Sequence, residues 1–383
     1  MTGRGVGAIS SIGLFGDGAE VVLRKIFKPT SGDAAEFKAG EIFLGQIGSG
    51  GEVIDQVTIG CEGENHFAIN CHGNPLIVEM IMELLARESV RLITAEQFLF
   101  NVLAAEGKYN TLTIEAKIEQ VKAKTIEGTQ IIYNQIEGGL NEACQRWLAD
   151  IEAVDAIKAE AEGILCRSRT AKLIIRGCVA VLAGPANSGK STLLNCLCGR
   201  DKAIVTDIKG TTRDWVSGRC RLKGLSVKLI DTAGLYEEAV INEDATVEKL
   251  SQEKSVEVLE KADLVLLVLD GNEGGVQLTK RLIELIEEKK VLTVLNKSDL
   301  PARFDIGELP ETLINLIWIS AKSERGIDDL KEKILHTTGV AGFDIEETVC
   351  FTLRQERLLR QLCSVKNKEE GHSAITELLN GRI

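Results

Sequence analysis

Short apolar runs separated by glycine characterise the first 90 residues of the chain. The runs cover residues 8–14, 21–27, 42–47 and 67–69. Runs of this length between turn-forming residues predict short β-strands. Residues 75–85 form a longer apolar segment that begins with proline, a residue favoured in the first turn of a helix. We therefore predict a small α+β domain over residues 1–90.

A different pattern holds on both sides of residues 173–338. There, apolar residues recur at intervals of three and four positions. This spacing is typical of amphipathic helices, and it involves Ile114, Ile118, Val121 and Ile126, then Leu140, Cys144, Trp147, Leu148 and Ile151, and finally Leu353, Leu358, Leu359 and Leu362. Between the two regions, strand-like and helix-like segments alternate, which predicts a mostly parallel sheet with helices on both faces. We predict an α/β domain, residues 173–338, inserted into a helical domain. The two pieces of the helical domain, residues 91–172 and 339–383, are expected to pack together.

Composition narrows the class of protein. With 44% hydrophobic residues, 27% charged residues and 5 prolines in 383, the chain is typical of an ordered globular protein. It has neither a run of about 18 apolar residues nor a secretory leader, so we expect a cytoplasmic protein that does not engage a membrane. A net charge of −12 means that a nucleic acid would need a local basic patch. The ten scattered cysteines contain no CxxC pair and are expected to be buried thiols, not zinc ligands.

A phosphate-binding motif opens the α/β domain. Residues 184–191 read Gly-Pro-Ala-Asn-Ser-Gly-Lys-Ser, between a predicted strand at 179–183 and a predicted helix at 192–198. Its glycines let backbone amides surround a β-phosphate at the positive end of the helix. We expect Lys190 to contact the β- and γ-phosphates and the Ser191 hydroxyl to bind Mg²⁺. The residues of this motif that we predict to contact the nucleotide or its Mg²⁺ are Asn187, Ser188, Gly189, Lys190, Ser191 and Thr192.

Further motifs follow at the ends of later predicted strands. Strand 227–230 leads into Asp231, Thr232, Ala233 and Gly234, where the aspartate can hold the Mg²⁺ shell and the last amide can sense the γ-phosphate. In the polar loop 206–214, Thr212 is expected to close over Mg²⁺.

The last two motifs concern the base. Strand 291–295 leads into Asn296, Lys297 and Asp299. The carboxylate of Asp299 can accept two hydrogen bonds from guanine that adenine cannot supply. Residues Ser320, Ala321 and Lys322 follow the predicted strand 316–319 and bring backbone amides near the guanine oxygen. Five elements in this order predict a Ras-like P-loop G domain that binds GTP and GDP and hydrolyses GTP.

The group that orients the attacking water is less evident from the motifs. Leu235 stands where Ras-type proteins carry glutamine, so another residue must do this work. Asn187 suggests one solution, because some GTPases use asparagine there to hold a monovalent cation. An ordinary loop role for Asn187 is the alternative.

The motifs GPANSGKS, TDIKGTTRD and DTAGL resemble those of the MnmE (TrmE) family of tRNA-modification GTPases. Residues 4–9 resemble the family's RGxGAI segment, and Cys71-His72-Gly73 resembles its HGG turn. The resemblance implies a potassium-stimulated GTPase that forms a homodimer through its G domains. It also implies a flavin-dependent partner, with which the protein modifies the wobble uridine of certain tRNAs using a folate derivative.

The resemblance also assigns residues. It places K⁺ on Asn187, Thr206, Ile208 and Thr211, and Mg²⁺ on Ser191 and Thr212. The family's catalytic glutamate aligns with Glu248 when counted back from residues 260–263, and with Glu243 when counted forward from Asp231. We choose Glu248, acting with Lys190, as the catalytic pair; an ordinary solvated role stays open for either glutamate.

The sequence departs from the family in several places. The family ends in Cys-Ile-Gly-Lys, whose cysteine tRNA modification requires, whereas this sequence ends at Asn380-Gly-Arg-Ile383. The family's folate-contacting arginine and glutamate align with Gly13 and Ala68, and Lys108 is a candidate for a third contact. Because charge-assisted bonds are worth about 1.5–3 kcal/mol each, we expect folate to bind poorly. A regulatory GTP switch without folate chemistry is therefore an alternative. A ribosome-assembly GTPase ranks last, since no basic C-terminal segment is present.

Overall fold

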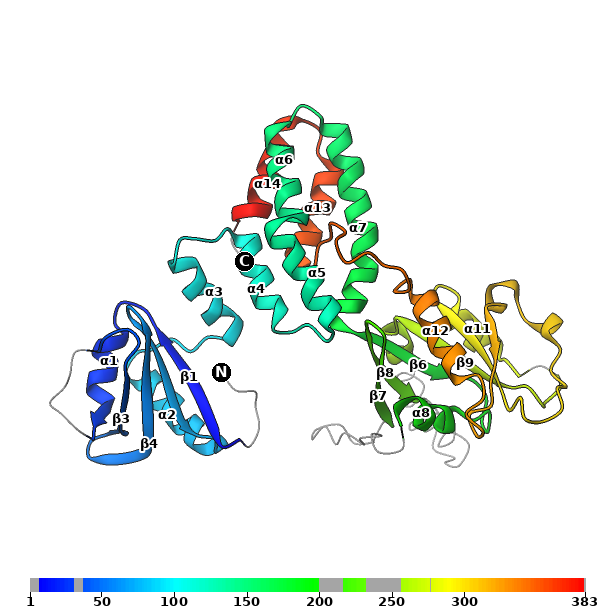
Figure 1. Ribbon diagram of the computed structural model, residues 1–383, viewed down its shortest axis with the longest axis horizontal. Coiled ribbons are helices and arrows are strands. Elements are labelled where there is room, and N and C mark those ends of the chain that lie inside the picture. The colour runs from blue at the N-terminus through cyan, green and yellow to red at the C-terminus, as the bar shows by residue number, and fades with distance from the viewer. Residues whose placement is uncertain (1–6, 31–36, 200–215, 232–255, 276, 382–383) are drawn as a thin grey trace. The chain divides into compact units, whose positions relative to one another are not determined.

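The computed structural model describes residues 7–30, 37–199, 216–231, 256–275 and 277–381 (Figure 1). The chain divides into two compact units, Met1–Ile118 and Glu119–Ile383. Within the described residues, no helix is both long enough and apolar enough to cross a membrane.

The N-terminal unit is built on a five-stranded antiparallel sheet in the order β1-β5-β4-β3-β2. The strands are β1 (Ile9–Phe15), β2 (Phe27–Pro29), β3 (Ile42–Ser49), β4 (Glu52–Gly63) and β5 (His66–His72). Helices α1 (Ala19–Ile26) and α2 (Pro75–Arg87) cover one face. Leu23, Ile47, Ile59, Ile69 and Ile81 are fully buried between the helices and the sheet.

The strand predicted at residues 21–27 is wrong, because most of this segment is helix α1. Ala19, Leu23 and Ile26 are buried at helical spacing, whereas Val21 is 60% exposed. Arg24 forms an ion pair with Glu20 one turn earlier, at 2.7 Å. The apolar run therefore forms one face of a helix, and extended structure begins only at Phe27.

Helices α3 (Ala95–Ala105) and α4 (Thr111–Gln120) follow α2 along the chain. Ile114 and Ile118 are buried in α4 as expected, but Val121 and Ile126 are 81% and 77% exposed. The region is helical as predicted, but Val121 and Ile126 do not share the buried face of α4, because α4 ends at Gln120 and a new helix starts after Thr125. The Thr125 hydroxyl accepts a hydrogen bond from Gly128 N at 2.9 Å and caps that new helix.

Helices from both sides of the α/β domain form one bundle. They are α5 (Ile126–Glu137), α6 (Gly139–Ala149), α7 (Val154–Arg176), α13 (Leu353–Ser364) and α14 (Lys368–Asn380). Figure 1 shows α13 and α14, at the red end of the colour range, packed with α6 and α7. Leu358, Leu359 and Leu362 are buried, while Leu353, the first residue of α13, is 73% exposed. The helices from α5 to α7 therefore pack with α13 and α14 across the inserted domain.

A six-stranded sheet in the order β11-β10-β9-β6-β8-β7 forms the inserted domain. Its strands are β6 (Cys178–Ala183), β7 (Ser217–Leu222), β8 (Leu225–Asp231), β9 (Leu264–Asp270), β10 (Val291–Asn296) and β11 (Leu316–Trp318). Its helices include α8 (Lys190–Cys198), α11 (Lys280–Ile286) and α12 (Ile327–Thr338). Only β7 is antiparallel to its neighbour among these strands. Strands β9 and β10 are buried at every position, which requires cover on both faces and confirms the α/β fold.

Candidate nucleotide-binding site

The predicted site residues gather at one edge of the parallel sheet. The phosphate loop follows β6, Asp231 ends β8, Asn296 ends β10 and Ser320 lies just after β11. Since these strands run parallel, their carboxyl ends share an edge. This edge is where open α/β sheets bind their ligands.

The backbone of the phosphate loop requires glycine at two positions. Gly184 has a φ of +136°, and a Cβ there would lie 2.1 Å from the carbonyl oxygen of Val268. Gly189 has a φ of +95°, and its Cβ would lie 2.2 Å from Nδ2 of Asn296. Asn187 also has a positive φ, +59°, which asparagine tolerates better than most residues. The loop thus turns tightly into the N-terminus of α8.

Lys190 lies against this loop, with its side chain almost fully buried. Its Nζ donates to the carbonyl oxygens of Gly184 at 3.1 Å and Pro185 at 2.7 Å. These contacts fix the ammonium group at the loop. Phosphate oxygens cradled by the loop would therefore lie within its reach.

Two oxygen-bearing side chains meet beside the loop. Ser191 Oγ donates to Asp231 Oδ2 at 2.6 Å, and Asp231 is buried. A hydroxyl and a carboxylate next to a phosphate site form the oxygen donor set that Mg²⁺ prefers. The residues therefore fit the ion that GTPases generally use.

Asn296 links the phosphate loop to the last predicted motif. Its Nδ2 donates to the carbonyl oxygen of Ser188 at 2.9 Å, and its Oδ1 accepts from Ala321 N at 2.9 Å. The side chain is 3% exposed. Through this buried amide, the two loops hold a fixed spacing.

Asp299 is an exposed carboxylate at the same edge. A hydrogen bond from the Ser320 side chain holds the pKa of Asp299 below its ordinary value, with help from its own backbone amide and from Lys322 and Lys297. Ser298 N donates to the carbonyl oxygen of Ile319 at 2.9 Å, which brings the two loops together. Asp299 therefore stays ionised and acts only as an acceptor near neutral pH.

Sequence reasoning missed one buried carboxylate at this edge. Asp270 ends β9, and its Oδ2 lies 2.6 Å from Nζ of Lys297. The signal was present in the sequence, because residues 264–270 read as six apolar residues followed by a single aspartate.

Comparisons with known proteins agree with this geometry. Residues 179–297 match a family described as a 50S ribosome-binding GTPase. The tRNA modification GTPase MnmE of Clostridioides difficile (strain 630) is 30% identical over 370 residues, 87% of this chain and 79% of that protein. MnmE of Desulforamulus reducens is 33% identical over 376 residues, 88% of this chain and 80% of that protein. This chain belongs to the MnmE family. Like the other members of the MnmE family it is a GTPase, a hydrolase acting on GTP.

A solved G domain is also similar to part of this MnmE-family chain. The G domain of the T. maritima FeoB iron transporter is 30% identical, covers 42% of this chain and 98% of that chain, and has a TM-score of 0.34.

Several residues that the motifs or the MnmE resemblance assigned to the site lie outside the described part of the chain. They are Thr206, Ile208, Thr211, Thr212, Thr232, Ala233, Gly234, Glu243 and Glu248. The described site therefore contains the phosphate loop, Asp231 and the two motifs predicted to bind the base.

The two folate contacts that the MnmE resemblance implies, at Gly13 and Ala68, do not fit the side chains present there. Gly13 and Ala68 lie directly opposite each other in the β1–β5 pairing. A Cβ on Gly13 would lie 2.4 Å from Cζ of Phe98, so the aromatic ring fills the space of a longer side chain. Lys108 is 72% exposed and lies 3.7 Å from Glu106. The two aligned positions offer a folate anion no charged partner.

Phe98 is held in this place by aromatic neighbours. Its ring centroid lies 6.5 Å from that of Phe15 and 5.6 Å from that of His66. Burial lowers the pKa of His66, which favours the neutral ring. In this MnmE-family chain a cluster of three rings, Phe15, His66 and Phe98, therefore packs over Gly13 on the outer face of β1 and β5.

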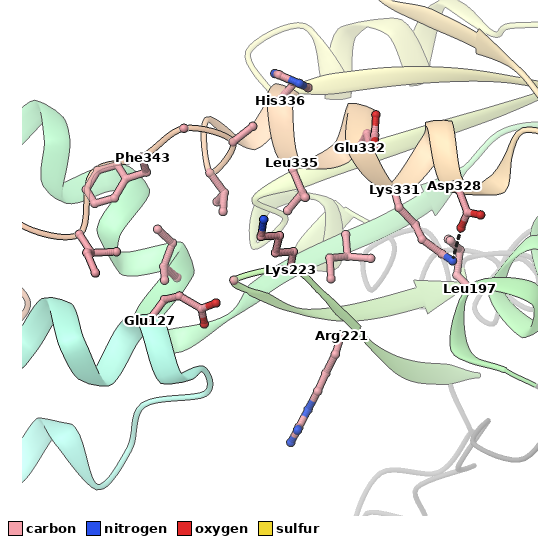
Figure 2. Close-up of a pocket in the computed structure, with 17 residues that line it drawn as sticks. Glu127, Leu197, Arg221, Lys223, Asp328, Lys331, Glu332, Leu335, His336 and Phe343 are labelled. Carbon is pink, nitrogen blue, oxygen red and sulfur yellow. Dashed lines mark hydrogen bonds and ion pairs between the residues drawn. The ribbon is translucent and has the colours of Figure 1, made fainter.

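A cavity of about 720 Å³ lies elsewhere in the second unit (Figure 2). It is lined by the β7–β8 turn, α12 and the segment that follows α12, together with Glu127 of α5. Lys331 and Asp328 form an ion pair across 2.8 Å at its rim. Because none of Lys190, Asp231, Asn296 and Asp299 lines it, this cavity is separate from the nucleotide site.

Proposed function

We propose that this GTPase acts in tRNA modification, as its MnmE relatives do by name, and that it binds GTP at the sheet edge described above. The observation that carries the site is the buried Asn296 amide, which joins the phosphate loop to the loop after β11. A nucleotide needs both loops at a fixed separation, because its phosphates and its base bind at opposite ends of the site.

The side chains then take distinct roles in hydrolysis. Lys190 donates to the β- and γ-phosphate oxygens as charge moves onto them. Ser191 and Asp231 hold Mg²⁺ and its shell, and the ion would supply further positive charge beside the transferred phosphoryl group. Asp299 accepts two hydrogen bonds from the guanine edge, and backbone amides of residues 321 and 322 face the guanine oxygen.

Cation stimulation and dimerisation belong to the same proposal. Asn187 is the described member of the K⁺ set, and its left-handed backbone turns the loop at that point. Thr206, Ile208 and Thr211 complete the set, Thr212 joins Ser191 on Mg²⁺, and Glu248 orients the attacking water. Pairing of two G domains is proposed to assemble these groups, with a flavin-dependent protein and tRNA as further partners.

Hydrolysis in different cations tests the cation proposal. GTP turnover of the purified protein is measured in KCl and in NaCl at equal ionic strength, with Mg²⁺ present in both. We expect faster turnover in KCl, together with a shift to a dimer when GDP and aluminium fluoride are added. Equal turnover in both salts would contradict the assignment of Asn187 to a K⁺ site. Failure to retain GTP in Mg²⁺ would contradict the nucleotide site itself.

A second candidate function is a regulatory GTP switch without folate chemistry. The packing of Phe98 against Gly13, with Ala68 opposite, favours it. Titration with 5-formyltetrahydrofolate, followed by calorimetry, separates the two candidates at the level of the cofactor. Wobble-uridine levels in a deletion strain then test the pathway, since unchanged levels would favour the switch.

A further inference from the structure

Asp270 occupies a place in the nucleotide site that none of the recognised motifs covers. It lies opposite Asn296 in the β9–β10 register, at the carboxyl edge of the sheet. Its side chain is largely buried, with Oδ2 2.6 Å from Nζ of Lys297 and Oδ1 accepting from Asn272 N at 2.9 Å. Both oxygens are thus directed by hydrogen bonds.

Lys297, the partner of Asp270 in this ion pair, has a restrained conformation as well. Lys297 has a φ of +65°, in the left-handed region that a side chain disfavours. Its carbonyl oxygen accepts from Leu300 N at 2.9 Å, and its side chain is 33% exposed. Lys297 is therefore fixed at its backbone by the turn and at its tip by Asp270.

Further hydrogen bonds fix the backbone at Asp270. Gln277 Oε1 accepts from Asp270 N at 2.9 Å, and Gln277 Nε2 donates to the carbonyl oxygens of Asp270 at 2.8 Å and of Glu273 at 3.0 Å. Gly271 N donates to the carbonyl oxygen of Asn296 at 2.9 Å. A Cβ on Gly271 would lie 2.5 Å from the Trp318 ring, so the backbone of this turn lies close against that ring.

We infer that Asp270 is a positioning residue for guanine-nucleotide binding. Its carboxylate holds Lys297 extended, so that the aliphatic stem of the lysine forms one wall of the base site. A lysine stem is otherwise flexible, and ordering it on binding would weaken affinity. The inference rests on the proposed placement of guanine beside Lys297 and Asp299.

Nucleotide dissociation constants and turnover test this role. Full-length wild type, Asp270→Asn, Lys297→Ala and the double variant are titrated with fluorescent GDP and a fluorescent non-hydrolysable GTP analogue. Asp270→Asn should weaken both nucleotides alike by about tenfold, the value of one charge-assisted bond. Turnover at saturating GTP should be unchanged. Because Asp270 acts through Lys297, the double variant should bind no more weakly than Lys297→Ala alone.

The control removes a similar ion pair away from the site. Asp328→Asn breaks the 2.8 Å pair with Lys331 on α12 and should leave both affinities as in wild type. Lys297→Met keeps the stem but removes the ammonium group, so it should weaken binding about as much as Asp270→Asn. If Asp270→Asn does not fold, Lys297→Met still tests the ion pair from the lysine side.

Three results would overturn the inference. They are unchanged affinity in Asp270→Asn, additive losses in the double variant, and wild-type affinity in Lys297→Met. A wild-type protein that binds no guanine nucleotide would instead refute the proposed site. The two failures are therefore distinguishable.

Discussion

The carboxyl edge of the G-domain sheet and the outer face of the N-terminal sheet differ in the side chains that they carry at the positions where the sequence or the MnmE resemblance predicts ligand contacts. At the G-domain edge, Lys190, Asp231 and Asn296 each have a defined hydrogen-bonding partner. On the N-terminal sheet, the corresponding positions are Gly13 and Ala68, and the Phe98 ring packs over the glycine.

This difference shows that an aromatic side chain can fill one predicted ligand position while another predicted site in the same chain keeps its polar side chains. The N-terminal core behind the sheet is complete, since Ile47, Ile59 and Ile69 have no exposed surface. On the outer face, Gly13 and Ala68 carry no charged side chain at the positions where the MnmE resemblance predicts folate contacts. We therefore expect the G domain to depend on its charges and the N-terminal unit to depend on the fit of its aromatic cluster.

Removing Lys190 is expected to have the largest effect on the polar side of this comparison. Lys190→Ala deletes two charge-assisted contacts to phosphate, worth about 1.5–3 kcal/mol each, so GTP affinity should fall by about 10²- to 10⁴-fold. Equilibrium titration with fluorescent GTP measures the loss. Lys331→Ala, on α12 away from the site, is the matched control. Retained affinity in Lys190→Ala would contradict the proposed phosphate site.

Replacing the proposed catalytic glutamate should affect turnover and not binding. Glu248→Ala is expected to lower turnover in KCl by about 10²-fold or more while GTP affinity stays unchanged, because the residue acts on the attacking water. Glu243→Ala is the matched variant. If Glu243→Ala is instead the variant that lowers turnover, the catalytic glutamate is Glu243, as the alignment counted forward from Asp231 indicates. Glu248 would then have an ordinary solvated role.

Base selectivity should change when Asp299 loses its charge. Asp299→Asn is expected to weaken GTP by about 10- to 100-fold, because one acceptor becomes a donor facing the guanine amino group. The same amide can donate to the C2 carbonyl of xanthine, so xanthosine triphosphate should bind better than in wild type. Competition between the two nucleotides measures the switch, and unchanged selectivity would refute the role of Asp299.

The pKa of Asp299 adds a pH dependence to this prediction. Since its pKa lies below the ordinary 3.8, the carboxylate stays ionised as pH falls from 7 towards that value. Its contribution to guanine affinity is present above its pKa and is lost only as pH falls through it. A loss of guanine selectivity near pH 6 would therefore point to another group.

The sequence predicted where the phosphate loop, Asp231 and Asn296 lie on the G-domain sheet, because each of them follows a strongly apolar strand. The strands before Asp231 and Asn296 alternate with helices, and parallel order alone brings their ends to one edge. Asp270 was missed because a lone aspartate after an apolar run carries no motif. Its role depends on a contact with Lys297 that only the fold creates. Strand β7 was missed because residues 217–222 alternate polar and small residues, as an edge strand can.

The N-terminal unit was harder to predict for a physical reason. Its apolar runs are short, and a run such as residues 21–27 satisfies both a strand and one face of a helix. Leu23 is buried and Val21 is exposed, which is the pattern of a helix. Burial depends on tertiary packing, so the sequence alone does not show it. Likewise, the sequence shows that residue 13 is glycine, but only the structure shows that Phe98 fills the space above it.

The smallest expected effect tests the packed side of the comparison. Gly13→Ala places a Cβ 2.4 Å from Cζ of Phe98, so the ring must shift out of its contacts with Phe15 and His66. Overpacking of this kind costs about 1–3 kcal/mol, which urea denaturation measures. Gly18→Ala is the control, because nothing lies within 4 Å of its Cβ. In a Phe98→Ala background the cost of Gly13→Ala should disappear, since the clash has been removed. An equal cost in both backgrounds would show that Phe98 does not fill this site, and the contrast between the two regions would then fail.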